Sequence, residues 1–139
     1  MKQFIKDLFS VAMLSLATVS LTAQTAADGL KDAYRNYFSI GVAVNQRNIS
    51  DPAQVALIKK EFNSITAENA MKPVSVQPEK GKWNWAAADS VANFCRRNGI
   101  KLRGHCLMWH NQIGAWMYED QNGHLLSKRG FYRNMKDHI

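Results

Sequence analysis

Side chains that could bind a ligand are concentrated in one stretch, KLRGHCLMWHNQIGAW, at residues 101–116. Part of it is apolar and is predicted to be a buried strand containing Leu102, Cys106, Leu107 and Met108. The rest is polar or aromatic: Arg103, His105, Trp109, His110, Gln112 and Trp116. Buried polar atoms need hydrogen-bond partners, so this group indicates a bound solute. Indole stacks on flat apolar faces, and imidazole, amide and guanidinium groups hydrogen-bond to hydroxyls, which together favour a sugar.

A metal site is a weaker interpretation of the same residues. His105 and His110 could be taken for a ligand pair, but no third ligand follows at a useful spacing, and zinc sites use three or four protein ligands. We therefore predict no metal and no cofactor. His105 could also be a hydrogen-bonded core residue. A core position is favoured for Trp83 and Trp85, whereas the polar neighbours of Trp109 favour a sugar platform.

Three short strands are expected to position these side chains. Bulky and small residues alternate over residues 37–44, which is typical of a strand with one bulky and one small face. Further strands are predicted at residues 63–67 and 101–107. Polar or aromatic residues lie at or just after their carboxyl ends: Glu68 and Asn69 for the second strand, His105 and Trp109 for the third.

Three helices are expected to alternate with these strands. The first runs from Pro52 to about Glu61, after a cap at Asp51. The second ends at Gly99, and the third is capped by Ser127. Apolar residues at helical spacing identify the last two helices: Ala88, Val91, Ala92 and Cys95 in one, and Phe131, Met135 and Ile139 in the other.

Strands that alternate with helices indicate a parallel α/β fold. Each expected strand sends bulky apolar residues to one face and small or polar residues to the other, and polar residues gather at the carboxyl ends, where barrels carry their chemistry. The sequence therefore predicts a (β/α)8 TIM barrel, of which this chain holds about the first three βα units.

Residues 1–23 have the pattern of a secretory signal peptide, with a basic start, an apolar run and small residues at its end. Cleavage is predicted after Ala23, with Ala27 as the alternative. Residues 24–36 would then lead into a domain at residues 37–139. The apolar run is too short for a spanning helix, so we expect export to the periplasm or the extracellular space without a membrane anchor.

Charge and cysteine content narrow the function further. The net charge is +7, but the longest basic clusters are pairs such as Lys59-Lys60, so a basic soluble surface is favoured over nucleic-acid binding. The two cysteines, Cys95 and Cys106, are predicted to be free and buried, because both fall on apolar faces, although export would allow a disulfide. Nothing in the sequence indicates the oligomeric state.

Three motifs resemble glycoside hydrolase family 10, the endo-1,4-β-xylanases, in order and spacing. They are TAENAMK at residues 66–72, QPEKGKWNWAAAD at 77–89 and RGHCLMWHNQIGAW at 103–116. The resemblance covers roughly residues 37–139. It implies a (β/α)8 barrel that hydrolyses internal β-1,4 bonds of xylan with retention, so that the enzyme would act in xylan degradation with xylan or a xylo-oligosaccharide as its partner.

The resemblance also implies roles for individual residues. Glu68, Asn69 and Lys72 would bind the xylose next to the cleaved bond on its non-reducing side, and His105, Trp109 and Gln112 would complete that subsite. Further candidates are Arg103, His110 and Trp116. At Gly114 the family usually has proline, so a looser loop is expected before Trp116.

Catalysis is expected to need residues outside this chain, because the family's two catalytic glutamates would lie beyond Ile139. Glu68 ends a strand and could be taken for one of them, but Lys72 lies one helical turn away and is expected to hold it ionised as a binding group. The isolated chain is therefore expected to be inactive.

Two alternatives to a longer xylanase remain, a non-catalytic xylan-binding remnant and an inactive truncated fragment. Three βα units would leave an open sheet edge, so residues 24–139 are expected neither to melt cooperatively nor to bind xylan.

Overall fold

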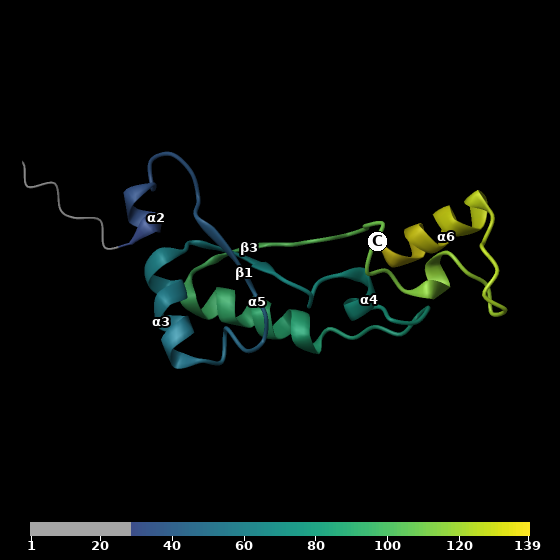
Figure 1. Ribbon diagram of the computed structural model, residues 1–139, viewed down its shortest axis with the longest axis horizontal. Coiled ribbons are helices and arrows are strands. Elements are labelled where there is room, and N and C mark those ends of the chain that lie inside the picture. Colours follow the sequence, from purple (N-terminus) through teal and green to yellow (C-terminus); the bar gives the residue numbers. More distant parts are fainter. Residues whose placement is uncertain (1–28) are drawn as a thin grey trace, which may run out of the picture.

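The computed structural model describes residues 29–139 (Figure 1). The expected signal peptide and both of its cleavage points lie outside these residues. Among the residues described, no helix is long and apolar enough to span a membrane. The strands are β1 (Gly41–Val44), β2 (Ser64–Ala67) and β3 (Lys101–Arg103). The helices are α2 (Leu30–Ala33), α3 (Pro52–Glu61), α4 (Pro73–Val76), α5 (Ala86–Asn98) and α6 (Lys128–His138), and η1 (Ala115–Met117) is a 3-10 turn.

The three strands form one parallel sheet in the order β1-β2-β3. α3 connects β1 to β2, α5 is the longer helix between β2 and β3, and both helices lie along the sheet on the same side (Figure 1). Gly41 pairs with Ser64, and Ser64 pairs with Lys101, so the carboxyl ends of the strands meet at one edge. The predicted order of parallel strands and helices is confirmed.

Apolar residues of the sheet and of α3 and α5 meet in one core. Along β2, the buried Ile65 and Ala67 alternate with the half-buried Ser64 and Thr66, as the period of a strand predicts. Full burial of an aliphatic or aromatic side chain stabilises a protein by about 1.5–3 kcal/mol, so this core holds the sheet and the two helices together. Its buried members are Val44, Ile58, Ile65, Ala67, Val91, Phe94 and Cys95.

Local sequence signals set the ends of α3 and α5. Asp51 precedes α3, and its Oδ1 accepts hydrogen bonds from the amides of Ala53 at 2.8 Å and Gln54 at 3.2 Å. Pro52 suits the first position because no helical partner is needed for an amide there. α5 ends at Gly99, whose φ of 64° lies in the left-handed region that favours glycine. The predicted bounds of α3 and the predicted end of α5 are confirmed.

β1 is shorter than predicted. The expected strand began at Tyr37, but β1 begins at Gly41, and the amides of Tyr37 and Phe38 instead donate hydrogen bonds to the carbonyl oxygen of Tyr34. The rings of Tyr34 and Phe38 stack with centroids 5.1 Å apart. These turn hydrogen bonds compete with strand pairing, so the alternating pattern of the sequence extends further than the strand.

β3 is also shorter than predicted, and its side chains are exposed. It ends at Arg103, whereas the predicted strand continued to Leu107, and Leu107 is 72% exposed. Leu102 is exposed as well. Among the residues described, β3 has a neighbouring strand on one edge only, which leaves its outer side uncovered. Cys95 and Cys106 are both free, as predicted, but only Cys95 is fully buried, and that burial raises the pKa of its thiol.

Trp83 and Trp85 are not core residues, contrary to the favoured interpretation. Both are exposed, and their rings stack on each other with centroids 5.0 Å apart and planes 8° apart. With Leu107 and Ile139 they line an open hollow of about 470 Å³. Met108, predicted to be buried, is only half-buried. Within residues 29–139 no further element covers this hollow, so the two tryptophans, Leu107 and Ile139 are exposed although they are apolar.

α6 packs through a different face from the one predicted. Ser127 caps it as expected, with its Oγ accepting a hydrogen bond from the Gly130 amide at 3.2 Å. The fully buried residues are then Gly130, Asn134 and His138, whereas Ile139, on the predicted face, is 68% exposed. Polar contacts explain the choice: the Asn134 side chain donates to the carbonyl oxygens of Trp116 and Met117, and His138 contacts Gln77. The apolar face of Phe131 and Met135 stays half-buried.

Candidate functional site

Lys72 is the centre of a small polar cluster at the carboxyl ends of β2 and β3. Its Nζ donates hydrogen bonds to Asn69 Oδ1 at 2.9 Å and to Gln112 Oε1, and Gln112 Nε2 lies 3.4 Å from the same Asn69 oxygen. The ammonium group also lies 5.3 Å from the centre of the Trp109 ring, in a cation–π contact. Asn69, Lys72, Trp109 and Gln112 are called the Lys72 cluster below. The structure therefore brings together four of the six residues proposed for the sugar subsite.

The backbone holds the two halves of the Lys72 cluster in register. Asn69 and Lys72 share one turn after β2, because the Lys72 amide donates to the Asn69 carbonyl at 3.0 Å. Gln112 belongs to the loop after β3, and its carbonyl accepts a hydrogen bond from the amide of Val74, in α4, at 2.9 Å. Gln112 has a φ of 53°, and its amide bonds to Asn111 Oδ1 at 2.8 Å. This left-handed turn directs the loop back toward α4.

The two histidine candidates extend this cluster. The ring of His105 lies 6.0 Å from that of Trp109, at an angle of 55°, and the peptide bond between His105 and Cys106 is cis. The ring of His110 lies 5.3 Å from that of Trp109 and is nearly perpendicular to it. His105 is half-buried, and His110 is exposed. The indole thus lies among a lysine and two imidazoles, with hydrogen-bonding groups around an apolar face.

Glu68 has a different partner from the one expected. Its Oε2 accepts a hydrogen bond from Asn45 Nδ2 at 3.1 Å, and the ammonium of Lys72 bonds to Asn69 and Gln112 instead. The expected pairing of Glu68 with Lys72 is therefore wrong. Adjacent strand ends explain the difference, because Asn45 directly follows β1 and the Glu68 amide pairs with the Val44 carbonyl at 2.8 Å.

Asn45 was missed by sequence reasoning, although a signal for it exists. It follows the last residue of β1, in the same relative position as Glu68 after β2. Its Oδ1 accepts the amides of Arg47 and Asn48, at 3.0 and 3.2 Å, so its side chain is held at the end of the sheet while its Nδ2 reaches Glu68. A polar residue at the carboxyl end of every predicted strand was the pattern to look for.

Two further candidates lie apart from the Lys72 cluster. Arg103 is exposed at the end of β3. Trp116 turns away, and its Nε1 donates to the Gln77 carbonyl at 3.0 Å. The expectation of a loose loop before Trp116 is wrong: Gly114 is buried, and a β-carbon there would lie 2.6 Å from the indole Cδ1 of Trp116 and 2.9 Å from the Pro78 carbonyl oxygen. Within residues 29–139, no group of three His, Cys, Asp or Glu side chains is placed to hold a metal ion.

His138 connects α6 to the loops on either side of the cluster. Its Nδ1 lies 2.7 Å from Gln77 Oε1, and its ring stacks on Trp83 with centroids 5.5 Å apart. Burial lowers the pKa of this imidazole below its ordinary value of 6.5, and contact with the Leu107 backbone opposes that shift. Gln77 lies in the loop after α4, and α4 is contacted by the loop of Gln112. Leu107 lies in the loop after β3, two residues before Trp109. His138 therefore stabilises both loops in its neutral form.

Stability is expected to fall below about pH 6.5 because of His138. The imidazole has a lower pKa in the folded state than in the unfolded state, so on acidification the unfolded chain takes up the proton first and the free energy of unfolding decreases. Urea unfolding of the longer protein in which this chain is expected to lie, at pH 7.5 and pH 5.5, measures the change, and His138→Gln is expected to make it smaller. An equal loss in the variant and the unaltered protein would contradict this prediction.

Comparison with known proteins adds three findings. A family model, that of glycosyl hydrolase family 10, matches residues 29–139. An endo-1,4-beta-xylanase/feruloyl esterase of Xylanibacter ruminicola is 55% identical over 135 residues, which is 91% of this chain but 19% of that protein. An endo-1,4-beta-xylanase A of Thermotoga maritima is 38% identical over 125 residues, covering 87% of this chain and 12% of that protein.

Solved structures agree with these relatives. A psychrophilic glycoside hydrolase family 10 endo-beta-1,4-xylanase matches with a TM-score of 0.76 and 65% identity, covering 81% of this chain and 34% of that one. A mutant structure in complex with xylotriose matches with a TM-score of 0.73 and 31% identity, covering 79% of this chain and 33% of that one. The chain thus spans about a third of these solved chains, and about a fifth or less of the two curated relatives.

Proposed function

The chain belongs to glycosyl hydrolase family 10 and forms the first part of a (β/α)8 barrel, and on that premise we propose that it is the substrate-binding N-terminal part of a secreted endo-1,4-β-xylanase. We call the natural protein that continues past Ile139 the extended enzyme. It cleaves internal β-1,4-xylosidic bonds of xylan with retention, using two glutamates supplied after Ile139. Residues 1–23 direct its export to the periplasm or the extracellular space.

The Lys72 cluster is the observation that supports this proposal most directly. A xylose ring offers hydroxyl groups at its edge and C–H groups on its faces. Asn69, Lys72 and Gln112 provide hydrogen-bond donors and acceptors, and Trp109 provides a flat apolar ring at 5.3 Å from the ammonium group. His105, beside Trp109, is placed to bond a hydroxyl of the same sugar.

Binding by this cluster also serves the reaction. A retaining glycosidase passes through an oxocarbenium-like transition state, in which the sugar ring is distorted and hydrogen bonds to its hydroxyls strengthen. Lys72 forms charge-assisted hydrogen bonds, which contribute about 1.5–3 kcal/mol each, compared with about 0.5–1.5 kcal/mol for neutral ones. Its amide partners, Asn69 and Gln112, keep the ammonium group in place before substrate arrives, so little ordering is needed on binding.

The function is tested by hydrolysis of xylan with the extended enzyme. Endo-cleavage is expected to lower the viscosity of a xylan solution well before reducing ends accumulate, and retention is expected to release products first as the β-anomer, which proton NMR detects. No release of reducing ends from xylan would contradict the proposed activity. First release of the α-anomer would contradict retention alone.

Substitutions at the subsite test the role of this chain within that activity. Asn69→Ala is expected to lower kcat/KM for xylo-oligosaccharides about tenfold, because one hydrogen bond of about 1.4 kcal/mol corresponds to that factor. Glu68→Ala and His105→Ala are expected to lower it in the same direction. Asn93→Ala, on the exposed face of α5, is the matched control. Unchanged kinetics in Asn69→Ala would remove the cluster from the substrate site.

A further inference from the structure

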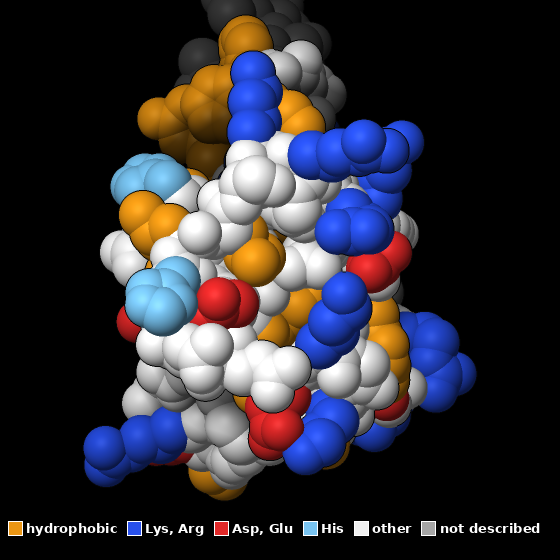
Figure 2. Space-filling view, turned by 90° about the vertical axis from the view of Figure 1, so that its right-hand side faces the viewer, with side chains coloured by type: hydrophobic (Ala, Val, Ile, Leu, Met, Phe, Trp, Pro, Cys, Tyr) orange, Lys and Arg blue, Asp and Glu red, His pale blue; other side chains and the backbone are white. Residues whose placement is uncertain are grey.

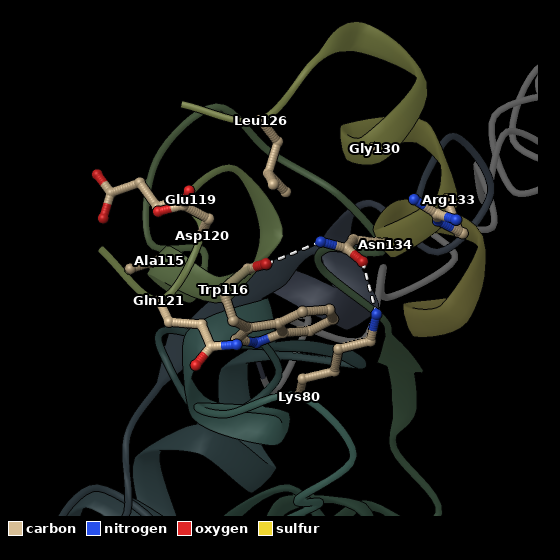
Figure 3. A pocket seen from close by; sticks show the side chains of 10 residues that line it. All are labelled: Lys80, Ala115, Trp116, Glu119, Asp120, Gln121, Leu126, Gly130, Arg133 and Asn134. Atoms are coloured by element: carbon tan, nitrogen blue, oxygen red, sulfur yellow. Dashed lines mark hydrogen bonds between the residues drawn. The ribbon is translucent and has the colours of Figure 1, made fainter. Parts of the chain in front are cut away.

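A second hollow lies between η1, the hairpin at residues 118–126 and α6 (Figure 3). Its volume is about 660 Å³, within the range of about 300–1,000 Å³ that is usual for ligand sites. It is lined by Lys80, Ala115, Trp116, Glu119, Asp120, Gln121, Leu126, Gly130, Arg133 and Asn134. We call it the α6 pocket. It shares no residue with the Lys72 cluster, and it contains Trp116, which that cluster does not use.

The indole of Trp116 is a fixed wall of the α6 pocket. Its Nε1 is bonded to the Gln77 carbonyl, and its own carbonyl accepts a hydrogen bond from Asn134 Nδ2 at 2.8 Å. Gly114 packs closely behind the indole. Figure 3 shows Leu126 reaching toward the pocket from the side opposite the indole. The pocket therefore has two apolar walls, one of them an aromatic ring that loses little conformational freedom on binding.

Hydrogen bonds also fix the floor of the pocket. Asn134 Oδ1 accepts a hydrogen bond from Lys80 Nζ at 2.8 Å (Figure 3). The same ammonium group pairs with Asp137 at 3.3 Å and lies 6.0 Å from the centre of the Trp116 ring. In the hairpin, Asp120 Oδ1 accepts the amides of Asn122 and His124, at 2.8 and 3.0 Å, which shapes the turn and lowers the pKa of the Asp120 carboxyl. These contacts exist without a ligand, so the pocket is preorganised.

The rim carries polar side chains that can bind a ligand. Within residues 29–139, no hydrogen bond or ion pair engages the side chains of Glu119, Gln121 or Arg133. Lys80 and Arg133 are balanced by Glu119 and Asp120, so the lining has no excess of either sign. Figure 2 shows that Lys and Arg side chains are more numerous than Asp and Glu on the wider face at this end of the molecule, so the balance of charge is confined to the lining. A neutral ligand suits this lining better than a polyanion.

We propose that the α6 pocket is a second carbohydrate site, which binds a neutral pyranose unit of a polysaccharide chain away from the Lys72 cluster. The indole and Leu126 contact the C–H faces of the ring, and Glu119, Gln121 and Arg133 bond to its hydroxyls. That the polysaccharide is xylan rests on the proposed function, whereas binding of a neutral pyranose is inferred from the residues that line the α6 pocket. Such a site would hold the extended enzyme on the polymer without contributing to cleavage of short oligosaccharides.

The test compares matched double variants of the extended enzyme in native gels that contain soluble arabinoxylan. The background is Lys72→Ala, which weakens the Lys72 cluster and slows digestion of the gel. Adding Gln121→Ala with Arg133→Ala is expected to raise the dissociation constant for arabinoxylan about tenfold. The control pair is Asn122→Ala with Arg129→Ala, at exposed positions on the same two elements outside the pocket lining, and it is expected to leave retardation unchanged.

Three outcomes would overturn the proposal: equal retardation of the pocket and control variants, a complete loss of retardation in Lys72→Ala alone, or a pocket effect seen only in gels of polygalacturonate. In polygalacturonate, the pocket variant and the control variant, which carry the same net charge, are expected to migrate alike, since the ligand is neutral. Without the Lys72 change, the pocket variant is expected to hydrolyse xylotriose at the same kcat/KM as the unaltered enzyme. If the extended enzyme does not cleave xylan but the pocket variant still loses retardation, the result would support the carbohydrate site in the α6 pocket and contradict only the proposed function.

Discussion

Replacing Lys72 with alanine in the extended enzyme is expected to lower kcat/KM for xylo-oligosaccharides by about 10- to 100-fold. A hydrogen bond from a charged donor contributes about 1.5–3 kcal/mol, and each 1.4 kcal/mol is a factor of ten. Lys72 also bonds both Asn69 and Gln112, so its loss frees two amides that the substrate then has to order. Steady-state kinetics on xylotriose and longer xylo-oligosaccharides measures the effect.

Two further variants make the Lys72 result specific. Lys82→Ala removes an exposed lysine whose Nζ contacts only Glu79, at 2.6 Å, among the residues described, and it is expected to leave kcat/KM unchanged. Lys72→Arg keeps the charge but changes the geometry of the donors, so it is expected to recover only part of the activity. An alanine variant with the kinetics of the unaltered enzyme would show that the ammonium group does not contact the substrate.

Gly114→Ala is expected to lower the free energy of unfolding by about 1–3 kcal/mol, the usual cost of forcing a methyl group into a packed site. The new β-carbon would lie 2.6–2.7 Å from two atoms of the Trp116 indole ring and 2.9 Å from the Pro78 carbonyl oxygen. The φ of Gly114 is −68°, which any residue adopts, so the loss is steric rather than a matter of backbone strain. The urea midpoint of the extended enzyme reports the change.

Gly104→Ala is the matched control for Gly114→Ala. A β-carbon at Gly104 would meet no atom within 4 Å among the residues described, so the same chemical change is expected to leave the urea midpoint nearly unchanged. Equal midpoints for the two variants would contradict the tight packing around Trp116. Gly114→Ala, unlike Gly104→Ala, is also expected to weaken retardation by xylan, because it displaces Trp116, which forms a wall of the α6 pocket.

The features predicted correctly depend on short stretches of sequence. The cap at Asp51 and the left-handed end at Gly99 each involve residues within a few positions of one another, so the bounds of α3 and the end of α5 follow from local pattern. The alternation along β2 is likewise local. The family and its barrel follow from three motifs in register, and the comparisons confirm both.

The features predicted wrongly depend on neighbours that a local pattern does not name. Leu107 is apolar but exposed, because burial needs a covering element and none of the described residues supplies one. The partner of Glu68 is Asn45, from another strand end, rather than the lysine nearest in sequence. On α6, hydrogen bonds of Asn134 decide which face packs, although hydrophobic spacing favoured the adjacent face of Phe131, Met135 and Ile139.

Four of the residues proposed for the candidate site lie together in the structure, and their role in binding a sugar stays a prediction. The hydrogen bonds within the Lys72 cluster depend on the turn at Gln112. Gln112 has a positive φ, and nothing in the sequence of that loop predicts a left-handed residue there. Trp116 was grouped with these residues because of its proximity in sequence. In the structure Trp116 lies apart from the Lys72 cluster, because its indole N–H donates a hydrogen bond to the Gln77 carbonyl.

The order of the sheet has a consequence for how the protein is made. Each strand pairs with the one before it along the chain, so β1 meets β2, and β2 meets β3, without waiting for any distant segment. During synthesis a domain generally folds as one unit, and an N-terminal domain folds before the ones that follow it. The growing polypeptide can therefore bring β1, β2 and β3 together in that order, but the open edge of β3 is covered, and the fold completed, only after the later strands of the barrel have been made.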